Sequence, residues 1–423
     1  MPGLIVSAPA SGSGKTTVTL GLLRALARRG VAVRGAKAGP DYIDPRFHEA
    51  ACGRMSVNLD AWAMRPVRLA ALAAGDGLLI VEGAMGLFDG AAGGGGTTAD
   101  LARHLRLPVV LVVDAARMAQ SVVPLVAGFA AHDRDLDLGA VILNNVGSDR
   151  HEALLRQALA RLPIPVIGAL RRDPTLAHPS RHLGLVQAQE REDLDLFLDT
   201  AADRVARAVD LEALQVLAEP LPAAPPAPRI RPPAQRIAMA SDAAFAFAYP
   251  HLLADWRDQG AEILPFSPLA DEAVPQADFV YLPGGYPELH AGRLAAAETF
   301  MSSLRSASQS AVIHGECGGY MTLGETLEDA DGVTHRMAGL LPLATSFRER
   351  RLHLGYRRLH AVGGPFPGRW RAHEFHYATV AREAGPRLYA AQDASGAALP
   401  PMGLVRGRVS GSFAHLIDRS GDT

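Results

Sequence analysis

The first half of the chain alternates short apolar runs with amphipathic stretches, and this alternation strongly limits the folds that it can adopt. Residues 16–29 are typical of a helix, because Val18, Leu22 and Leu26 recur at four-residue steps and Gly30 follows them. The apolar runs have the length of buried strands and cover residues 4–8, 33–38, 78–81, 108–113, 139–143 and 165–170. Buried strands that alternate with helices predict an α/β fold with a parallel sheet covered on both faces.

The chain has 423 residues, more than the roughly 300 at which a single hydrophobic core stops growing, so we expect two domains. Residues 218–235 contain seven prolines, and we expect them to form neither helix nor sheet and to act as a semi-rigid linker. The predicted domains are therefore residues 1–217 and 236–423.

The second domain repeats the alternation and then departs from it. Strands are expected at residues 236–240, 262–265, 279–282 and 311–314, with a helix at residues 250–259. From residue 352 the expected strands, 352–362, 372–380 and 403–413, have no clear helices between them. This predicts a second, mainly parallel sheet flanked by helices, with a partly antiparallel margin.

Composition disfavours several classes of partner. The formal net charge of -2 argues against binding to nucleic acid or to a membrane surface. The apolar runs are far shorter than the ~20 residues of a transmembrane helix, and the first residues leave no room for an export signal. Because Cys52 and Cys317 lie in different halves of the chain, we expect free thiols in a reducing cytoplasm.

A glycine-rich segment between the first strand and the first helix has the context of a phosphate-binding loop. Its backbone N–H groups and the Lys15 side chain suit a nucleotide phosphate, and the Thr16 hydroxyl suits Mg²⁺. Pro9 replaces the first glycine of the usual pattern. The residues expected to bind ATP are Gly12, Ser13, Gly14, Lys15, Thr16 and Thr17.

Acidic residues follow two other predicted strands of the first domain. Glu82 and Asp89 follow one strand, and Asp41 and Asp44 follow another, which ends near Lys37. The sequence contains two lysines, Lys15 and Lys37. The carboxyl ends of parallel strands share one edge of a sheet, so these groups are expected to form a phosphoryl-transfer site with a hard divalent cation. The alternatives are that Glu82 and Asp89 are solvated loop acids, and that the segment after Lys37 is a tight Gly-Pro-Asp turn with local capping.

Glycines surround Cys317, which follows an apolar run and precedes a helix-like segment. Small neighbours permit the sharp turn that exposes a nucleophile, so we interpret Cys317 as one, although a buried structural cysteine is the alternative. His415 is the candidate base, and the glycines after residue 282 offer N–H groups to an oxyanion.

His373, Glu374 and His376 lack the spacing of a zinc motif, and we predict no metal there. The arginines at 348–358 face either a polycarboxylate or solvent.

Taken together, these segments resemble, over essentially the full length, the cobyrinic or hydrogenobyrinic acid a,c-diamide synthases of cobalamin biosynthesis. The first half is similar to the dethiobiotin-synthetase branch of P-loop proteins, in which the first loop glycine can be absent, and the second half to class I glutamine amidotransferases. The matching blocks are residues 10–21, 37–44, 58–60, 82–90, 282–288, 315–321 and 373–377.

The resemblance implies that Cys317 and His415 release ammonia from glutamine, with an oxyanion hole formed by the amides of Gly285 and Gly318. ATP would convert the a and c carboxylates of the corrinoid to acyl phosphates, which ammonia attacks. The resemblance also implies catalytic roles for Lys37 and Asp41, Mg²⁺ ligands at Thr16, Asp41 and Glu82, and substrate positioning by Asp44 and Asp89.

One departure and several alternatives remain. Class I amidotransferases commonly carry His-x-Glu, but residue 417 is Ile and the nearest acid is Asp418, so a Cys–His dyad is predicted. The alternative functions are a sister amidase, similar to cobyric acid synthase or nickel-sirohydrochlorin diamide synthase, and a partitioning-type ATPase with a silent second domain. Glutamine, ATP and a corrinoid are the expected partners, and a homodimer is left open.

Overall fold

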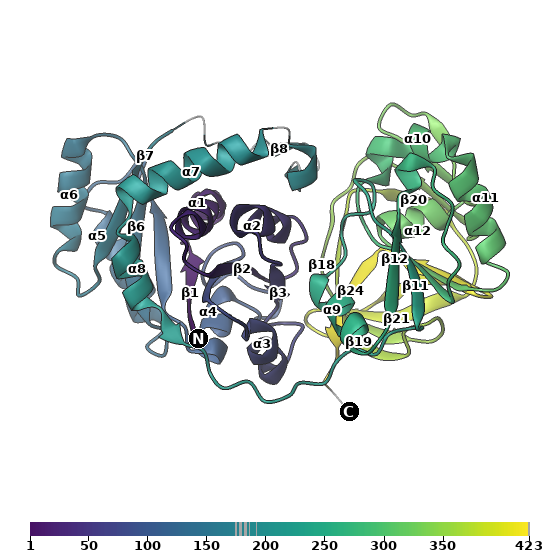
Figure 1. Ribbon diagram of the computed structural model, residues 1–423, viewed down its shortest axis with the longest axis horizontal. Helices are drawn as coiled ribbons and strands as arrows, with labels where there is room; N and C mark the ends of the chain where they lie inside the picture. The colour runs from purple at the N-terminus through teal and green to yellow at the C-terminus, as the bar shows by residue number, and fades with distance from the viewer. Residues whose placement is uncertain (174–175, 177–179, 182–183, 186, 192, 422–423) are drawn as a thin grey trace. The chain divides into compact units, whose positions relative to one another are not determined.

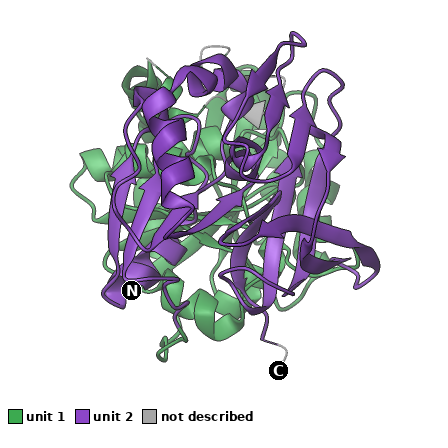
Figure 2. Ribbon diagram, turned by 90° about the vertical axis from the view of Figure 1, so that its right-hand side faces the viewer, with its two compact units in different colours: residues 1–228 green, residues 229–423 purple. Residues whose placement is uncertain are grey.

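The computed structural model describes residues 1–173, 176, 180–181, 184–185, 187–191 and 193–421. It divides the chain into two compact units, unit 1 (Met1–Pro228) and unit 2 (Arg229–Thr423) (Figure 2). In the described part of the chain, no helix combines the length and apolar composition needed to cross a lipid bilayer.

Unit 1 contains the parallel sheet that the sequence predicts, with strand order β3-β2-β4-β1-β5-β6-β7. Figure 1 shows α1, α2 and α7 over one face of this sheet, with α3 and α4 on the other side. The main strands are β1 (Pro2–Ser7), β2 (Val33–Ala38), β3 (Val57–Leu59), β4 (Leu78–Glu82), β5 (Val109–Asp114), β6 (Leu138–Val146) and β7 (Val166–Arg171).

The helices of unit 1 follow these strands in turn. They are α1 (Lys15–Arg28), α2 (Asp44–Cys52), α3 (Pro66–Ala73), α4 (Thr98–Leu105), α5 (Val122–His132), α6 (Asp149–Leu159), α7 (Leu194–Ala208) and α8 (Leu211–Leu217). Short segments complete the unit: β8 (Ser180–Arg181), β9 (Gly184–Leu185), the 3₁₀ helix η2 (Ala188–Glu190) and β10 (Glu219–Pro220).

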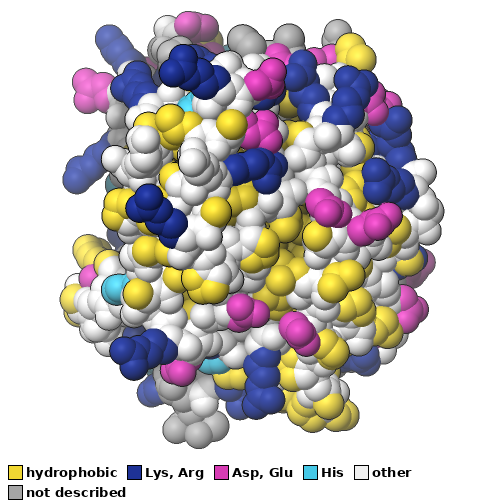
Figure 3. Space-filling model, turned by 90° about the vertical axis from the view of Figure 1, so that its left-hand side faces the viewer, with side chains coloured by type: hydrophobic (Ala, Val, Ile, Leu, Met, Phe, Trp, Pro, Cys, Tyr) yellow, Lys and Arg dark blue, Asp and Glu magenta, His cyan; other side chains and the backbone are white. Residues whose placement is uncertain are grey.

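Figure 3 shows the face of unit 1 that carries α5 and α6, where hydrophobic side chains gather in the centre. Only Val122 and Val126 of the apolar helix α5 are buried.

Unit 2 contains a ten-stranded mixed sheet with order β12-β11-β13-β14-β23-β22-β21-β18-β19-β24. Its first five strands pair in parallel and the remaining pairs are antiparallel, which confirms the predicted antiparallel margin. These strands are β11 (Arg236–Ala240), β12 (Glu262–Phe266), β13 (Phe279–Leu282), β14 (Val312–Glu316), β18 (His353–Ala361), β19 (Gly368–His376), β21 (Arg387–Asp393), β22 (Ala398–Arg406), β23 (Val409–Ser412) and β24 (Ala414–Arg419).

A second, four-stranded sheet and several helices complete unit 2. The sheet contains β15 (Thr326–Glu328), β16 (Thr334–Arg336), β17 (Leu343–Ser346) and β20 (Thr379–Glu383). The helices are α9 (Pro250–Asp258), η3 (Pro268–Ala270), η4 (Pro287–His290), α10 (Ala291–Ala296), α11 (Glu298–Ala307) and α12 (Gly318–Leu323).

Three expectations about local structure are wrong. The proline-rich segment does pair in a sheet, because β10 runs antiparallel to the first residues of β1 and the Leu221 N–H donates to the Met1 carbonyl oxygen. Residues 372–380 belong to two strands in different sheets, β19 and β20. Residues 403–413 form a hairpin, because Gly407 has a φ of 59° that suits a tight turn between β22 and β23.

Candidate active sites

The glycine-rich loop of unit 1 joins β1 to α1. Gly14 has a φ of 86°, a left-handed conformation that glycine adopts without strain, and α1 begins at the next residue. A side chain at position 14 would also collide with the Nδ2 atom of Asn144, which donates to the Ser13 carbonyl oxygen at 2.9 Å. The conformation of the loop therefore depends on this glycine and on an asparagine from β6.

A cavity of about 540 Å³ opens beside the loop, within the range of small-molecule sites. Of the six residues predicted to bind ATP, five line this cavity: Gly12, Gly14, Lys15, Thr16 and Thr17. The sixth, Ser13, donates its hydroxyl to the Ala10 carbonyl oxygen at 2.9 Å. Polar side chains from the ends of β6 and β7 line the cavity too: Asn144, Asn145, Arg171, Arg172 and Asp173.

A buried ion-pair cluster lies next to the loop. The Lys37 ammonium contacts the carboxylates of Asp44 and Glu82, the latter at 2.8 Å, and the Thr16 hydroxyl donates to the same Glu82 oxygen at 2.5 Å. Burial alone would lower the pKa of Lys37, but the two carboxylates raise it above its ordinary value. Burial raises the pKa of Asp44, and the charge of Asp41 raises it further. The cluster thus combines a permanent cation with two acids.

Both lysines of the chain lie close together here, as the sequence predicted. Burial lowers the pKa of Lys15, and the positive charge of Lys37 lowers it further. Asp89 is close enough for its charge to act on Lys15, and its Oδ2 accepts the Gly86 N–H at 2.8 Å. Asp41 also makes a hydrogen bond within its own loop: its Oδ1 accepts the Ile43 N–H at 2.7 Å, just before α2 begins.

His48 is a member of this cluster that the sequence pattern did not indicate. Its Nε2 lies 2.7 Å from Glu82 Oε2, and its Nδ1 lies 3.3 Å from the Ser56 hydroxyl, all within the buried interior. Burial acts to raise the pKa of Glu82, but Lys37 and the hydrogen bond with His48 lower it below its usual range. His48 therefore holds Glu82 in place and helps to keep it ionised.

In unit 2, Cys317 occupies the sharp turn between β14 and α12 that the sequence predicted. Its φ of 46° and ψ of -104° form a backbone conformation that L-residues rarely adopt, at a cost of about 1–3 kcal/mol. The adjacent backbone is tightly packed, because a Cβ on Gly319 would lie 2.6 Å from the carbonyl carbon of Leu282. The glycine is required for β14 and α12 to approach β13.

The imidazole of His415 lies beside Cys317. The point that a Cβ on Gly284 would occupy is 2.9 Å from His415 Nε2 and 3.2 Å from Cys317 Cβ, so both side chains border one small space. Burial raises the pKa of the Cys317 thiol, and the charge of Glu288 raises it further. Burial lowers the pKa of His415 to about 3. At neutral pH the pair is therefore a thiol beside a neutral imidazole.

The two glycines predicted to form an oxyanion hole lie against each other. A Cβ on Gly318 would be 3.0 Å from the backbone nitrogen of Gly285 and 2.8 Å from Pro287 Cδ. A Cβ on Gly285 would be 2.9 Å from the backbone nitrogen of Phe245. Only glycine fits either position without movement of its neighbours, and both backbones are next to the Cys317 turn.

Two acids near Cys317 were not singled out from the sequence. Glu316 directly precedes Cys317, and burial raises the pKa of its carboxyl to about 7. Glu288 follows the glycine turn, and burial raises its pKa to about 8, while the positive charge of Arg350 opposes this rise. The Oε2 atom of Glu288 is buried and has no hydrogen-bond partner among the described residues.

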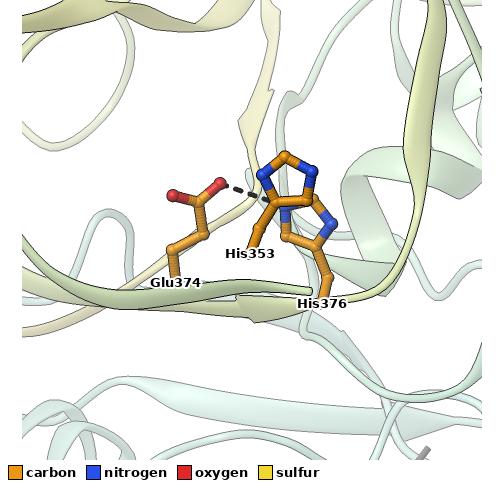
Figure 4. A group of neighbouring side chains, drawn as sticks. All are labelled: His353, Glu374 and His376. Carbon is orange, nitrogen blue, oxygen red and sulfur yellow. Dashed lines mark hydrogen bonds and ion pairs between the residues drawn. The ribbon is translucent and has the colours of Figure 1, made fainter. Parts of the chain in front are cut away.

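Figure 4 shows a second cluster of titratable side chains, and the charge of its Glu374 acts on both Cys317 and His415. Ligand atoms of His353, Glu374 and His376 all lie within 4.8 Å of one another, and the two imidazole rings stack with centroids 4.6 Å apart. Glu374 Oε1 lies 3.0 Å from His376 Nε2, and the Arg357 guanidinium donates to Glu374 Oε2 at 2.7 and 2.6 Å. Protein groups thus occupy both carboxylate oxygens, and the arginine charge opposes a cation at this position.

Comparisons with known proteins agree with this geometry. Residues 4–186 match the CobQ/CobB/MinD/ParA nucleotide binding domain, and residues 236–422 match the CobB/CobQ-like glutamine amidotransferase domain. The chain is 59% identical to hydrogenobyrinate a,c-diamide synthase of Sinorhizobium sp, with all of both chains covered. The chain belongs to the hydrogenobyrinate a,c-diamide synthase family. Other members are the synthases of Brucella abortus biovar 1 (strain 9-941), at 56% identity over all of both chains, and of Rhizobium meliloti (strain 1021), at 57% over 99% of this chain and 100% of that one.

Sequence reasoning did not single out four of the residues described above: Asn144, Glu288, Glu316 and His48. Asn144 and Glu288 carried a usable signal, because each follows a predicted strand or its glycine turn, where ligands bind in open α/β sheets. Glu316 directly precedes Cys317, the candidate nucleophile, but its sequence position gave no indication of the side chains that its carboxylate faces. His48 had no signal, since a histidine inside a helix is equally typical of a packed core.

Proposed function

We propose that the chain catalyses the ATP-dependent amidation of the a and c carboxylates of hydrogenobyrinic acid, with ammonia taken from glutamine. The observation that carries the proposal is the pairing, in one chain, of a thiol beside an imidazole in unit 2 and a phosphate loop beside a lysine–carboxylate cluster in unit 1. Sequence identities of 56–59% over essentially the full length to three hydrogenobyrinate a,c-diamide synthases support the same reaction.

Unit 2 supplies the ammonia. The Cys317 sulfur attacks the carboxamide carbon of glutamine while His415 takes the thiol proton and then delivers it to the departing ammonia. The N–H groups of Gly285 and Gly318, which lie beside Cys317, stabilise the negative charge on the carbonyl oxygen. Water then hydrolyses the thioester, which releases glutamate and restores the thiol.

Glu288 and Arg350 are suited to hold the amino-acid end of glutamine. Glutamine carries an ammonium and a carboxylate on one carbon, and the unpartnered oxygen of Glu288 lies in a buried position whose charge acts on Cys317. Pro287, the preceding residue, packs against the Gly318 position. We infer that Glu288 ionises when it receives the glutamine ammonium, and that Arg350 receives the carboxylate.

Unit 1 activates the acceptor, because a free carboxylate is a poor electrophile. A substrate carboxylate oxygen attacks the γ-phosphorus of ATP, ADP leaves, and ammonia then displaces phosphate from the acyl phosphate. Lys15 and the loop backbone hold the phosphates, and Lys37 stabilises the transferred phosphoryl group. Asp44 and Asp89 position the substrate. The sequence of steps runs twice, once for each carboxylate.

The residues of unit 1 fit a magnesium ion that accompanies ATP. Thr16 and Glu82 already share a hydrogen bond, and the Oδ1 atom of Asp44 is buried without a partner among the described residues, which leaves oxygen ligands at this position. Thr16, Asp41 and Glu82 would hold the ion, and Glu82 would then exchange its contacts with Lys37 and His48 for the ion. When bound, Mg²⁺ neutralises phosphate charge.

The domain boundaries, location and assembly complete the proposal. Residues 1–217 would act on ATP and corrinoid, and residues 236–423 on glutamine, with residues 218–235 as the connection. Both cysteines are free thiols, which favours a reducing cytoplasm. A homodimer stays a prediction, for which the apolar surface of α5 offers a contact face (Figure 3).

A two-part assay tests the proposal. The enzyme is incubated with ATP, Mg²⁺ and either hydrogenobyrinic or cobyrinic acid, with glutamine or an ammonium salt as nitrogen source, and product mass is read. Cys317→Ser should abolish turnover with glutamine and retain turnover with ammonium, whereas Lys15→Ala should lose both. Loss of both activities in folded Cys317→Ser enzyme would contradict the division of labour. Faster amidation of cobyrinic acid, which carries cobalt, would overturn the proposal that metal-free hydrogenobyrinic acid is the substrate.

A further inference from the structure

The carboxylate of Glu316 is held firmly beside the candidate nucleophile. Glu316 is the last residue of β14 and is 2% exposed. Its Oε2 accepts the Tyr281 hydroxyl at 2.8 Å, and its Oε1 accepts the backbone N–H of Leu416 at 3.2 Å. These two donors come from β13, which pairs with β14, and from β24, which does not, so two different strands fix the carboxylate in position.

Two imidazoles face this carboxylate: His314, whose Nε2 lies 3.9 Å from Glu316 Oε1, and His415. Glu316 Oε2 lies 3.8 Å from His415 Nδ1, whereas the opposite edge of the imidazole, at Nε2, borders the space shared with Cys317. Asp418, the acid nearest to His415 in the sequence, accepts the backbone N–H of Arg419. The spatial order is therefore thiol, imidazole, carboxylate, with the acid one residue before the cysteine.

We propose that Glu316 is the positioning carboxylate of His415, and that it replaces the acid that class I glutamine amidotransferases carry two residues after the histidine. The inference rests on the proposed hydrolysis of glutamine in unit 2. Glu316 does not touch the substrate; it orients the imidazole so that Nε2 faces the thiol, and it stabilises the imidazolium that forms when His415 takes the thiol proton. The separation of 3.8 Å is compatible with this role, because catalytic hydrogen bonds tighten when substrate binds.

The surroundings of Glu316 determine how the site responds to pH. Burial raises the pKa of Glu316 to about 7, and the hydrogen bonds from Tyr281 and Leu416 limit this rise by stabilising the charged form. Glutamine-supported kcat should therefore rise with pH through about 7, as Glu316 ionises. The other titratable groups near Glu316 or His415 are His314, Cys317, His373, Glu374, His376 and Tyr389.

The test compares Glu316→Gln, Glu316→Asp and Tyr281→Phe with wild type, in glutamine-supported and ammonium-supported amidation over a pH series. Glutamine preserves the shape of the side chain and can accept one of its two hydrogen bonds, but it removes the charge, so kcat with glutamine should fall about 100-fold or more while its KM changes little. Ammonium-supported turnover, which uses unit 1, should persist and report a folded chain. The aspartate variant should recover part of the loss.

Tyr281→Phe distinguishes a positioning role from a structural one. It retains the carboxylate but removes a hydrogen bond that favours its charged form, so the rise of kcat should move to higher pH. Glu298→Gln is the matched control, because Glu298 is an exposed glutamate at the start of α11 in the same unit. Its pH profile should equal that of wild type.

Two results would overturn the inference. If Glu316→Gln keeps the wild-type kcat and pH profile while Cys317→Ser is inactive with glutamine, the positioning role is wrong and the proposed function stands. If wild-type enzyme releases no glutamate from glutamine, the proposed function and this inference fail together.

Discussion

Gly284 offers a direct test of the shared space between the thiol and the imidazole. In Gly284→Ala the new methyl carbon would lie 2.9 Å from His415 Nε2 and 3.2 Å from Cys317 Cβ, both closer than an ordinary contact of 3.4–4 Å. Because the backbone turn fixes Cys317, the imidazole is the group that must move. A displacement of about 1 Å of a catalytic group costs about 100-fold in rate, so kcat with glutamine should fall by about that factor.

The assay measures glutamate release and amidation with glutamine, alongside amidation with an ammonium salt. The ammonium-supported rate should equal that of wild type, because Gly284 lies in unit 2. Gly292→Ala is the control: its new methyl carbon would be 3.5 Å from the nearest atom, in His335, and alanine stabilises a helix such as α10 by up to about 1 kcal/mol. Wild-type glutamine turnover in Gly284→Ala would refute the proposed geometry.

The remaining predictions concern Lys37 and Glu288. Lys37→Met leaves two buried carboxylates without their counter-charge, so the free energy of unfolding of unit 1 should fall by about 3–5 kcal/mol, measured by urea denaturation. The loss should shrink at acidic pH as the carboxylates take up protons, and an unchanged denaturation midpoint at pH 7 would contradict the ion-pair cluster. Glu288→Gln should raise the KM for glutamine about tenfold or more and leave ammonium-supported turnover intact, since it removes the charge that pairs with the glutamine ammonium. An unchanged KM would exclude Glu288 from glutamine binding.

Local patterns predicted most of the scaffold. The strand at residues 33–38 and the helix after the glycine-rich loop depend on periodicity and on Gly14 and Gly30, which act within a few residues. The proximity of Lys37 and Glu82 follows from sequence pattern as well, because adjacent parallel strands bring their carboxyl ends to one edge of the sheet.

Predictions failed where distant segments compete for the same strand. The pattern of residues 372–380 is typical of one continuous strand, yet His376 and Thr379 belong to different sheets, because β19 pairs with β18 and β24 while β20 pairs with β17. The proline-rich segment gains a sheet partner only because the first residues of β1 lie beside it.

What the sequence alone determined is the set of candidate groups for chemistry: the phosphate loop, Lys37 and Cys317 each stand in a local context that few other roles explain. What the tertiary structure decided is which groups support them. His48 of helix α2 meets Glu82 of β4 across 34 residues, and Glu316 of β14 meets His415 of β24, a strand with which β14 does not pair, because tertiary packing places them together. Burial then sets their protonation, and burial is a property of the packed fold that local sequence does not encode.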